Sequence, residues 1–141
     1  MSQDPRQSWL ARTGAGVVGI GFGLFLVGIF PRPVGLDITP GIGLLQIFTF
    51  LCGTAFMTLG AYIYMYATRH RAQLLSLRQD IGLRLMATGV VISFVTGLAD
   101  VIGIGTHLGN ERAFFGPVQA WGVALGVLTI IVGLAAYATK K

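Results

Sequence analysis

The chain has 141 residues, of which 54% are hydrophobic and 11% are charged. Soluble domains carry about 25% charged residues, so this composition excludes an ordinary water-soluble fold. The net charge of +5 would suit nucleic acid, but the basic residues follow the ends of apolar segments instead of forming a patch or stripe. We therefore expect no nucleic-acid partner.

Four apolar segments follow one another, at roughly 9–30, 42–67, 81–105 and 117–138. Each exceeds the roughly 20 residues that a helix needs to cross a bilayer. The sequence predicts an all-α integral membrane protein, a four-transmembrane-helix bundle that forms a single domain over residues 1–141. It would consist of a first two-helix hairpin at about 9–68, a connection at about 69–80 and a second hairpin at about 81–139.

Several residues mark the expected ends of these helices. Ser8 is the expected N-cap of the first helix, and Thr39-Pro40 provide the expected N-cap and first residue of the second. Pro117 is the expected first residue of the fourth. These residue types suit helix starts, because a hydroxyl satisfies a free backbone amide and proline lacks that amide.

The basic residues are distributed unequally between the two ends of the spans. Arg32 and Arg112 fall on one side, and the other eight of the ten Lys and Arg residues fall on the opposite side: Arg6, Arg12, Arg69, Arg71, Arg78, Arg84, Lys140 and Lys141. Short cytoplasmic segments carry such an excess. We therefore expect a multi-pass protein of the cytoplasmic membrane with both termini inside, and tyrosines that gather near the inner surface agree with that orientation.

An internal repeat is expected from a comparison of the two halves. A shift of 73 residues produces ten identities, among them Gly16/Gly89, Gln46/Gln119, Gly53/Gly126 and Gly60/Gly133. Both halves would enter the membrane from the same side, so they would be parallel repeats about an axis along the membrane normal.

Small residues recur at spacings that place them on one helix face, as in Ala15, Gly19 and Gly23. Such rows let helices approach closely in lipid. The residues expected to pack helices are Gly19, Gly23, Gly53, Gly60, Gly89, Gly97, Gly122, Gly126 and Gly133. Gln46 and Gln119 either hydrogen-bond to each other across the pseudo-symmetry axis or line a polar opening.

The candidate polar residues gather toward the outer side. Asp100 lies in the predicted third span about five residues from its end, where it is either functional or paired with Arg112 or Arg32. His107 and Glu111 form an HxxxE pair nearby. With one imidazole, this group predicts no metal site; it is a hydrated loop, a pH-sensitive cluster or a contact for a partner.

No arrangement of nucleophile, base and acid is evident, and the glycines lie inside spans, not in a phosphate loop. We therefore predict neither an enzyme nor a bound cofactor. The favoured interpretation is a non-catalytic accessory or structural subunit of a larger membrane complex, whose partners are the lipid bilayer and other subunits or further copies of itself. The alternative is a small oligomeric transporter or channel that uses Asp100, Gln46 and Gln119 as its polar lining. A lipid or quinone between helices is left open.

Overall fold

The computed structural model describes residues 5–30, 35, 43–70, 76–103 and 116–139. The regular elements in these ranges are all helices: α1 (Pro5–Ile29), α2 (Leu44–Met65), the π-helical turn η2 (Tyr66–His70), α3 (Leu77–Gly97), the short α4 (Ala99–Ile102) and α5 (Pro117–Ala138). Four of them, with α2 extended into η2, are long and apolar enough to cross a membrane. The predicted all-α class, with four helices long and apolar enough to span a membrane, is confirmed.

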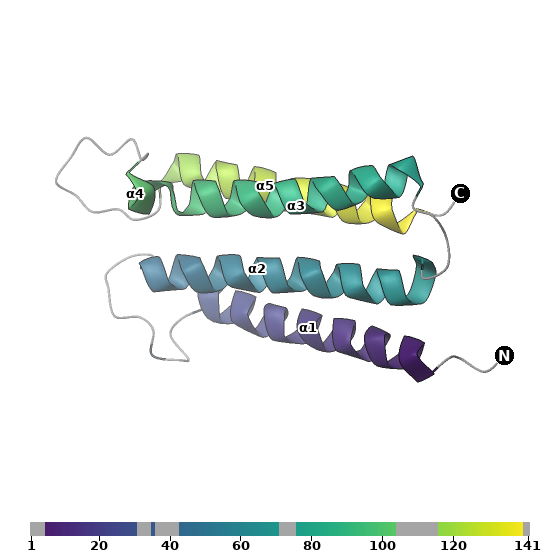
Figure 1. Ribbon diagram of the computed structural model, residues 1–141. Coiled ribbons are helices and arrows are strands. Elements are labelled where there is room, and N and C mark those ends of the chain that lie inside the picture. Colours follow the sequence, from purple (N-terminus) through teal and green to yellow (C-terminus); the bar gives the residue numbers. More distant parts are fainter. Residues whose placement is uncertain (1–4, 31–34, 36–42, 71–75, 104–115, 140–141) are drawn as a thin grey trace.

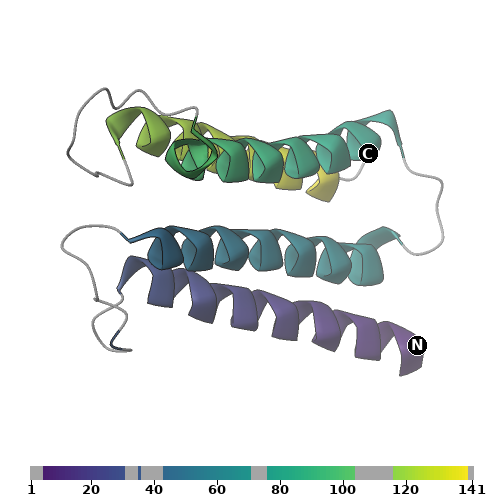
Figure 2. The ribbon, with the colours of Figure 1, turned by 60° about the vertical axis from the view of Figure 1, so that its left-hand side comes forward.

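The long helices run alternately up and down, so α1 begins and α5 ends at the same end of the molecule (Figure 1). We call this the terminal end, and the opposite end, where α2 and α5 begin, the loop end. The helix α1 packs mainly on α2, and we call these two helices the first pair. The helix α3 packs mainly on α5, and these two helices are the second pair. In both views α2 lies between α1 and the second pair (Figure 2).

The observed helix starts differ in part from the expected ones. Pro5, not Ser8, is the first residue of α1, a position where a missing amide removes no helical hydrogen bond. The α2 helix begins after Gly43, whose backbone is extended, so Thr39-Pro40 do not start it. Pro117 is the first residue of α5, as expected.

The third span is shorter at the loop end than the sequence suggested. Instead of continuing to residue 105, α3 ends at Gly97, and Leu98 has φ −101° and ψ 10°, which interrupts the helix. One further turn, α4, follows and ends at Gly103, whose φ of 81° is left-handed. Glycine accepts this conformation without a steric penalty, so it stops α4 here.

The first pair packs at backbone distance through glycines on both helices. An added Cβ at Gly21 of α1 would lie 2.5 Å from the backbone nitrogen of Met57, and one at Gly60 of α2 would lie 2.6 Å from that of Val18. Gly14 and Gly28 of α1 also face the backbone of α2. Gly14, Gly21 and Gly28 are seven residues apart, so they lie on one face of the helix.

The second pair repeats this packing. A Cβ at Gly89 of α3 would lie 2.6 Å from the carbonyl oxygen of Gly126, and one at Gly133 of α5 would lie 2.7 Å from that of Gly82. Glycines thus meet glycines on opposing helices of each pair. Close backbone approach of this kind increases van der Waals contact, which is a main source of helix association where lipid removes the hydrophobic difference.

The glycines expected to pack helices fall into three groups. Gly53, Gly60, Gly89, Gly126 and Gly133 lie against a neighbouring backbone, but Gly19 and Gly23 have no atom within 4 Å of an added Cβ. They lie on the exposed face of α1, because the row that meets α2 is offset from them by two residues. The two other expected packing glycines contact side chains instead: Gly122 meets Thr96, and Gly97 meets Leu51 and Val123.

Alanine substitution distinguishes the two faces of α1. We expect Gly21→Ala to lower the free energy of unfolding by about 1–3 kcal/mol, because the methyl group forces two backbones apart. Gly19→Ala, the same change on the open face, should leave it unchanged or raise it slightly, since alanine is the better helix former. Thermal or denaturant unfolding in detergent measures both. Equal effects of the two changes would contradict the described packing of α1 on α2.

Candidate functional site

The polar residues singled out in the sequence do not form one described cluster. His107, Glu111 and Arg112 lie outside the described residues. Asp100 is half-buried on α4, so it lies beyond the end of α3 and not within a continuous third span, as had been expected. The interruption at Leu98 accounts for the difference, because the sequence pattern alone does not distinguish one long helix from two.

The glutamines act as helix caps. The backbone amide of Gly43 donates to Gln46 Oε1 at 3.3 Å, and that of Gly116 donates to Gln119 Oε1. In each case a glutamine at the third helical position satisfies the amide of the residue that precedes the helix. Gln119 Nε2 is buried and has no hydrogen-bond partner in the described part of the chain. The expected bond between Gln46 and Gln119 is therefore not formed.

Hydroxyl groups inside the helices also bond locally. Thr58 donates to the carbonyl oxygen of Thr54 at 2.8 Å, and Ser93 donates to that of Gly89 at 2.9 Å. Thr96 does the same with Ile92 at 2.7 Å. A hydroxyl that is satisfied by the preceding turn can lie among apolar groups at little cost. These side chains therefore suit a dry interior.

The two pairs meet through side chains at a point nearer the loop end. Leu51 of α2 is completely buried and forms an apolar cluster with Ile47 and Val123 of α5. Its Cδ1 would lie 2.9 Å from a Cβ added at Gly97, so the glycine that ends α3 provides the space for this leucine. Here the pairs are held apart by a leucine, whereas within each pair the backbones touch.

A second contact lies toward the terminal end. The rings of Tyr62 on α2 and Tyr137 on α5 have centroids 5.5 Å apart, and Tyr66 lies next to Tyr62 at 6.2 Å. Ring pairs in this distance range attract each other beyond their area of contact. Tyr137 is fully buried, so it joins the pairs and is not part of a lipid-facing belt, the position that its place in the sequence suggested.

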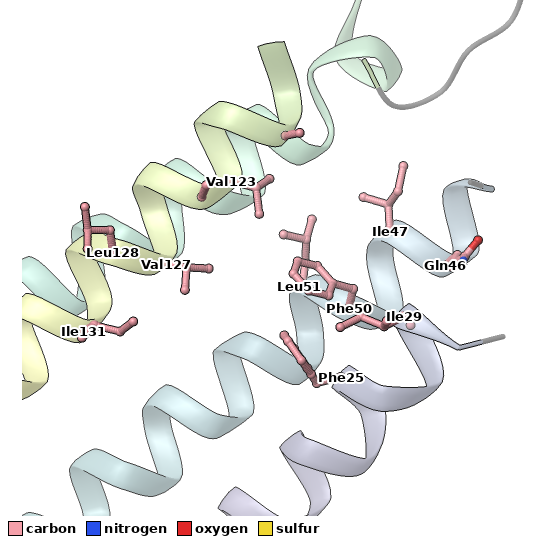
Figure 3. Close-up of a pocket in the computed structure, with 13 residues that line it drawn as sticks. Phe25, Ile29, Gln46, Ile47, Phe50, Leu51, Val123, Val127, Leu128 and Ile131 are labelled. Atoms are coloured by element: carbon pink, nitrogen blue, oxygen red, sulfur yellow. The ribbon is translucent and has the colours of Figure 1, made fainter. Parts of the chain in front are cut away.

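A partly open cavity of about 650 Å³ lies between the pairs at the loop-end half of the molecule. Its walls come from Phe25, Gly28 and Ile29 of α1, from α2 between Gln46 and Leu51, and from α5 between Ala120 and Ile131. Figure 3 shows Phe25, Phe50 and Leu51 on one side of it and Val123 and Val127 on the other. The rings of Phe25 and Phe50, 4.9 Å apart, form a continuous aromatic surface across α1 and α2.

The chemistry of the cavity is that of an apolar binding site. Gln46 is the polar side chain of its lining, and Asp100 is not part of it. Its size falls within the roughly 300–1,000 Å³ of ligand pockets. The sequence did not reveal it, because an apolar side chain that faces a cavity has the same pattern as one that faces lipid. The one sign of the cavity in the sequence is the pair of small residues Ala120 and Ala124, which lie four residues apart on α5 and leave space beside that helix.

Comparison with known proteins gives no relative on which a function could rest. No protein-family model matches the chain, and neither a curated protein nor a solved structure matches it.

Leu51 allows the contact between the pairs to be measured. We expect Leu51→Ala to lower the free energy of unfolding by about 2–5 kcal/mol, because the truncation leaves a void next to Gly97 and Val123. Leu59→Ala is the matched control on the same helix, since Leu59 is 51% exposed, and its effect should stay within about 0.5 kcal/mol. Unfolding monitored by tyrosine and tryptophan fluorescence in detergent gives both values. A Leu51→Ala protein as stable as the control would show that the pairs are not joined here.

Proposed function

We propose that the protein is a non-catalytic accessory subunit that associates, through α1, with other transmembrane helices. The observation that supports this is how little of α1 its own chain covers. In the apolar part of α1, 11% of residues are buried, against 28–33% in the other three spans. The main neighbours of α1 are α2 and the η2 turn that continues it, so one face of this helix is available to a partner.

The exposed face of α1 has the composition of a helix interface. Ala15, Gly19 and Gly23 are four residues apart and exposed, and at the two glycines nothing lies within 4 Å of an added Cβ. A transmembrane helix from another subunit, or from a second copy of this chain, can approach such a row at backbone distance, as α2 does on the opposite face.

The orientation we propose follows from charge. Arg6, Arg12, Arg78 and Arg84 all belong to the terminal end, and basic residues are retained on the cytoplasmic side. Both termini would then be cytoplasmic, in the cytoplasmic membrane, and α4 would lie toward the outer surface.

We also infer that the two pairs arose by duplication of one hairpin. In support, Gly53 and Gly60 face Gly21 and Gly14 as Gly126 and Gly133 face Gly89 and Gly82. Corresponding glycines are 73 residues apart in the second helix of each pair, as in Gly53 and Gly126. They are 68 residues apart in the first helix, as in Gly21 and Gly89. By these contacts Gly89 corresponds to Gly21. The 73-residue shift instead aligns Gly89 with Gly16, so the identities around Gly16 do not follow the packing. Five extra residues between α3 and α5, a segment that includes α4, would account for the difference.

The transporter alternative has less support. It requires a polar path through the bundle, but the described hydroxyls of Thr54, Thr58 and Ser93 bond within their own helices. The cavity between the pairs is apolar as well. A path for ions needs polar groups that face it.

Extraction of the chain from its native membrane in lipid nanodiscs tests the proposal. Mass spectrometry should find a stoichiometric partner, or further copies of the chain. The double change Gly19→Leu/Gly23→Leu should reduce the amount of partner recovered at least about tenfold, since two leucines block backbone approach. Ala87→Leu, at an exposed small residue of α3, should leave recovery unchanged. A self-sufficient particle with one copy of this chain alone would overturn the accessory role.

A further inference from the structure

We propose that the cavity between the two helix pairs holds one acyl chain of a membrane lipid. This goes beyond the association proposed for α1, which uses the opposite face of that helix. The cavity is a partly open place between α1, α2 and α5 where the fold leaves apolar surface uncovered. Its occupant can be argued from shape, polarity and position.

The cavity is elongated along the helices. Its lining on α5 runs from Ala120 to Ile131, about 16 Å at 1.5 Å per residue. An occupant that fills this length lies along the helix axes, as an extended hydrocarbon chain does.

A hydrocarbon chain does fit. It is flexible and apolar, so it can follow the elongated lining and match its chemistry in a cavity of about 650 Å³. Water itself is a poor occupant, because it needs two to four polar partners and apolar cavities of this kind stay dry.

The walls favour a flexible apolar chain over a compact polar ligand. Phe25 and Phe50 form one wall, and Val127 and Leu128 contribute to the opposite one (Figure 3). If the cavity were empty, each of these side chains would lack van der Waals contact on one side. A bound acyl chain restores that contact. Because the cavity is partly open and its lining comes from helices that cross the membrane, lipid can enter directly from the bilayer.

The position of Gln46 gives the lipid an orientation. Gln46 lies in the first turn of α2 at the loop end, and its Oε1 is bonded to the amide of Gly43. Its Nε2 is a hydrogen-bond donor on the lining of the cavity at the loop end of α2. We assign the lipid ester and head group to this end and the chain to the stretch between Phe25 and Val127.

The test uses the full-length protein in nanodiscs of phosphatidylcholine whose acyl chain carries a photoactivatable diazirine. Illumination followed by peptide mass spectrometry should give crosslinks at Phe25, Phe50 and Val127 as strong as those at Leu125, a lipid-facing residue of α5 that is 57% exposed. Ala124→Phe, which fills the cavity with a ring, should reduce the three crosslinks at least about fivefold.

Two controls keep the outcome interpretable. Ala87→Phe makes the same change at an exposed position of α3 and should leave the crosslinks at Phe25, Phe50 and Val127 unchanged. Ala120→Leu fills less of the cavity and should reduce them by a smaller factor, which separates filling from misfolding. Absence of crosslinks at these residues, or crosslinks unaffected by Ala124→Phe, would overturn the proposal. So would crosslinks from the same residues to a co-purifying protein in place of lipid.

Discussion

The close approach of backbones at glycine is the constraint on which the rest of this structure depends. In lipid, apolar side chains gain little by leaving the bilayer for one another, so helices associate where their shapes allow the densest contact. Gly21 opposite Gly53 and Gly89 opposite Gly126 provide that contact within each pair. The space there is too small for a methyl group, so these glycines cannot be replaced by alanine without moving the helices apart. Gly19, on the open face of α1, can be replaced.

The cavity follows from the contrast between contacts within pairs and contacts between them. Where the pairs meet, Leu51 and the rings of Tyr62 and Tyr137 act as spacers. Side chains of this size hold helices farther apart than glycine does, and the gap beside Leu51 is not filled by the chain itself. The same contrast explains why polar groups play so small a part here: the hydroxyls of Thr54, Thr58, Ser93 and Thr96 bond within their own helices, and the packing between helices is left to shape.

Much of this fold could be predicted from the sequence, because span length, hydrophobicity and small-residue spacing are local properties. The four spans and the heptads Gly53/Gly60 and Gly126/Gly133 were found in this way. The sequence did not tell which glycine row of α1 meets α2, since Gly14, Gly21 and Gly28 and the pair Gly19 and Gly23 fit a small-residue pattern equally well. Only the position of α2 decides between them. The end of α3 at Gly97 and the cavity beside Leu51 likewise depend on a backbone angle and on packing distances, which no residue pattern contains.

The central claim is that glycines pack two helix pairs at backbone distance, whereas side chains join the pairs around an apolar cavity. Spin-label distances measured by double electron–electron resonance test it most directly, with Cys52 replaced and labels at exposed residues: Ile20 and Leu59 within the first pair, and Leu59 and Leu125 between the pairs. The account predicts a narrow distance distribution within the pair that is the same in detergent and in bilayers, and a distribution between the pairs that is broader in detergent and narrows in lipid. Equal widths for both label pairs in both environments would contradict it.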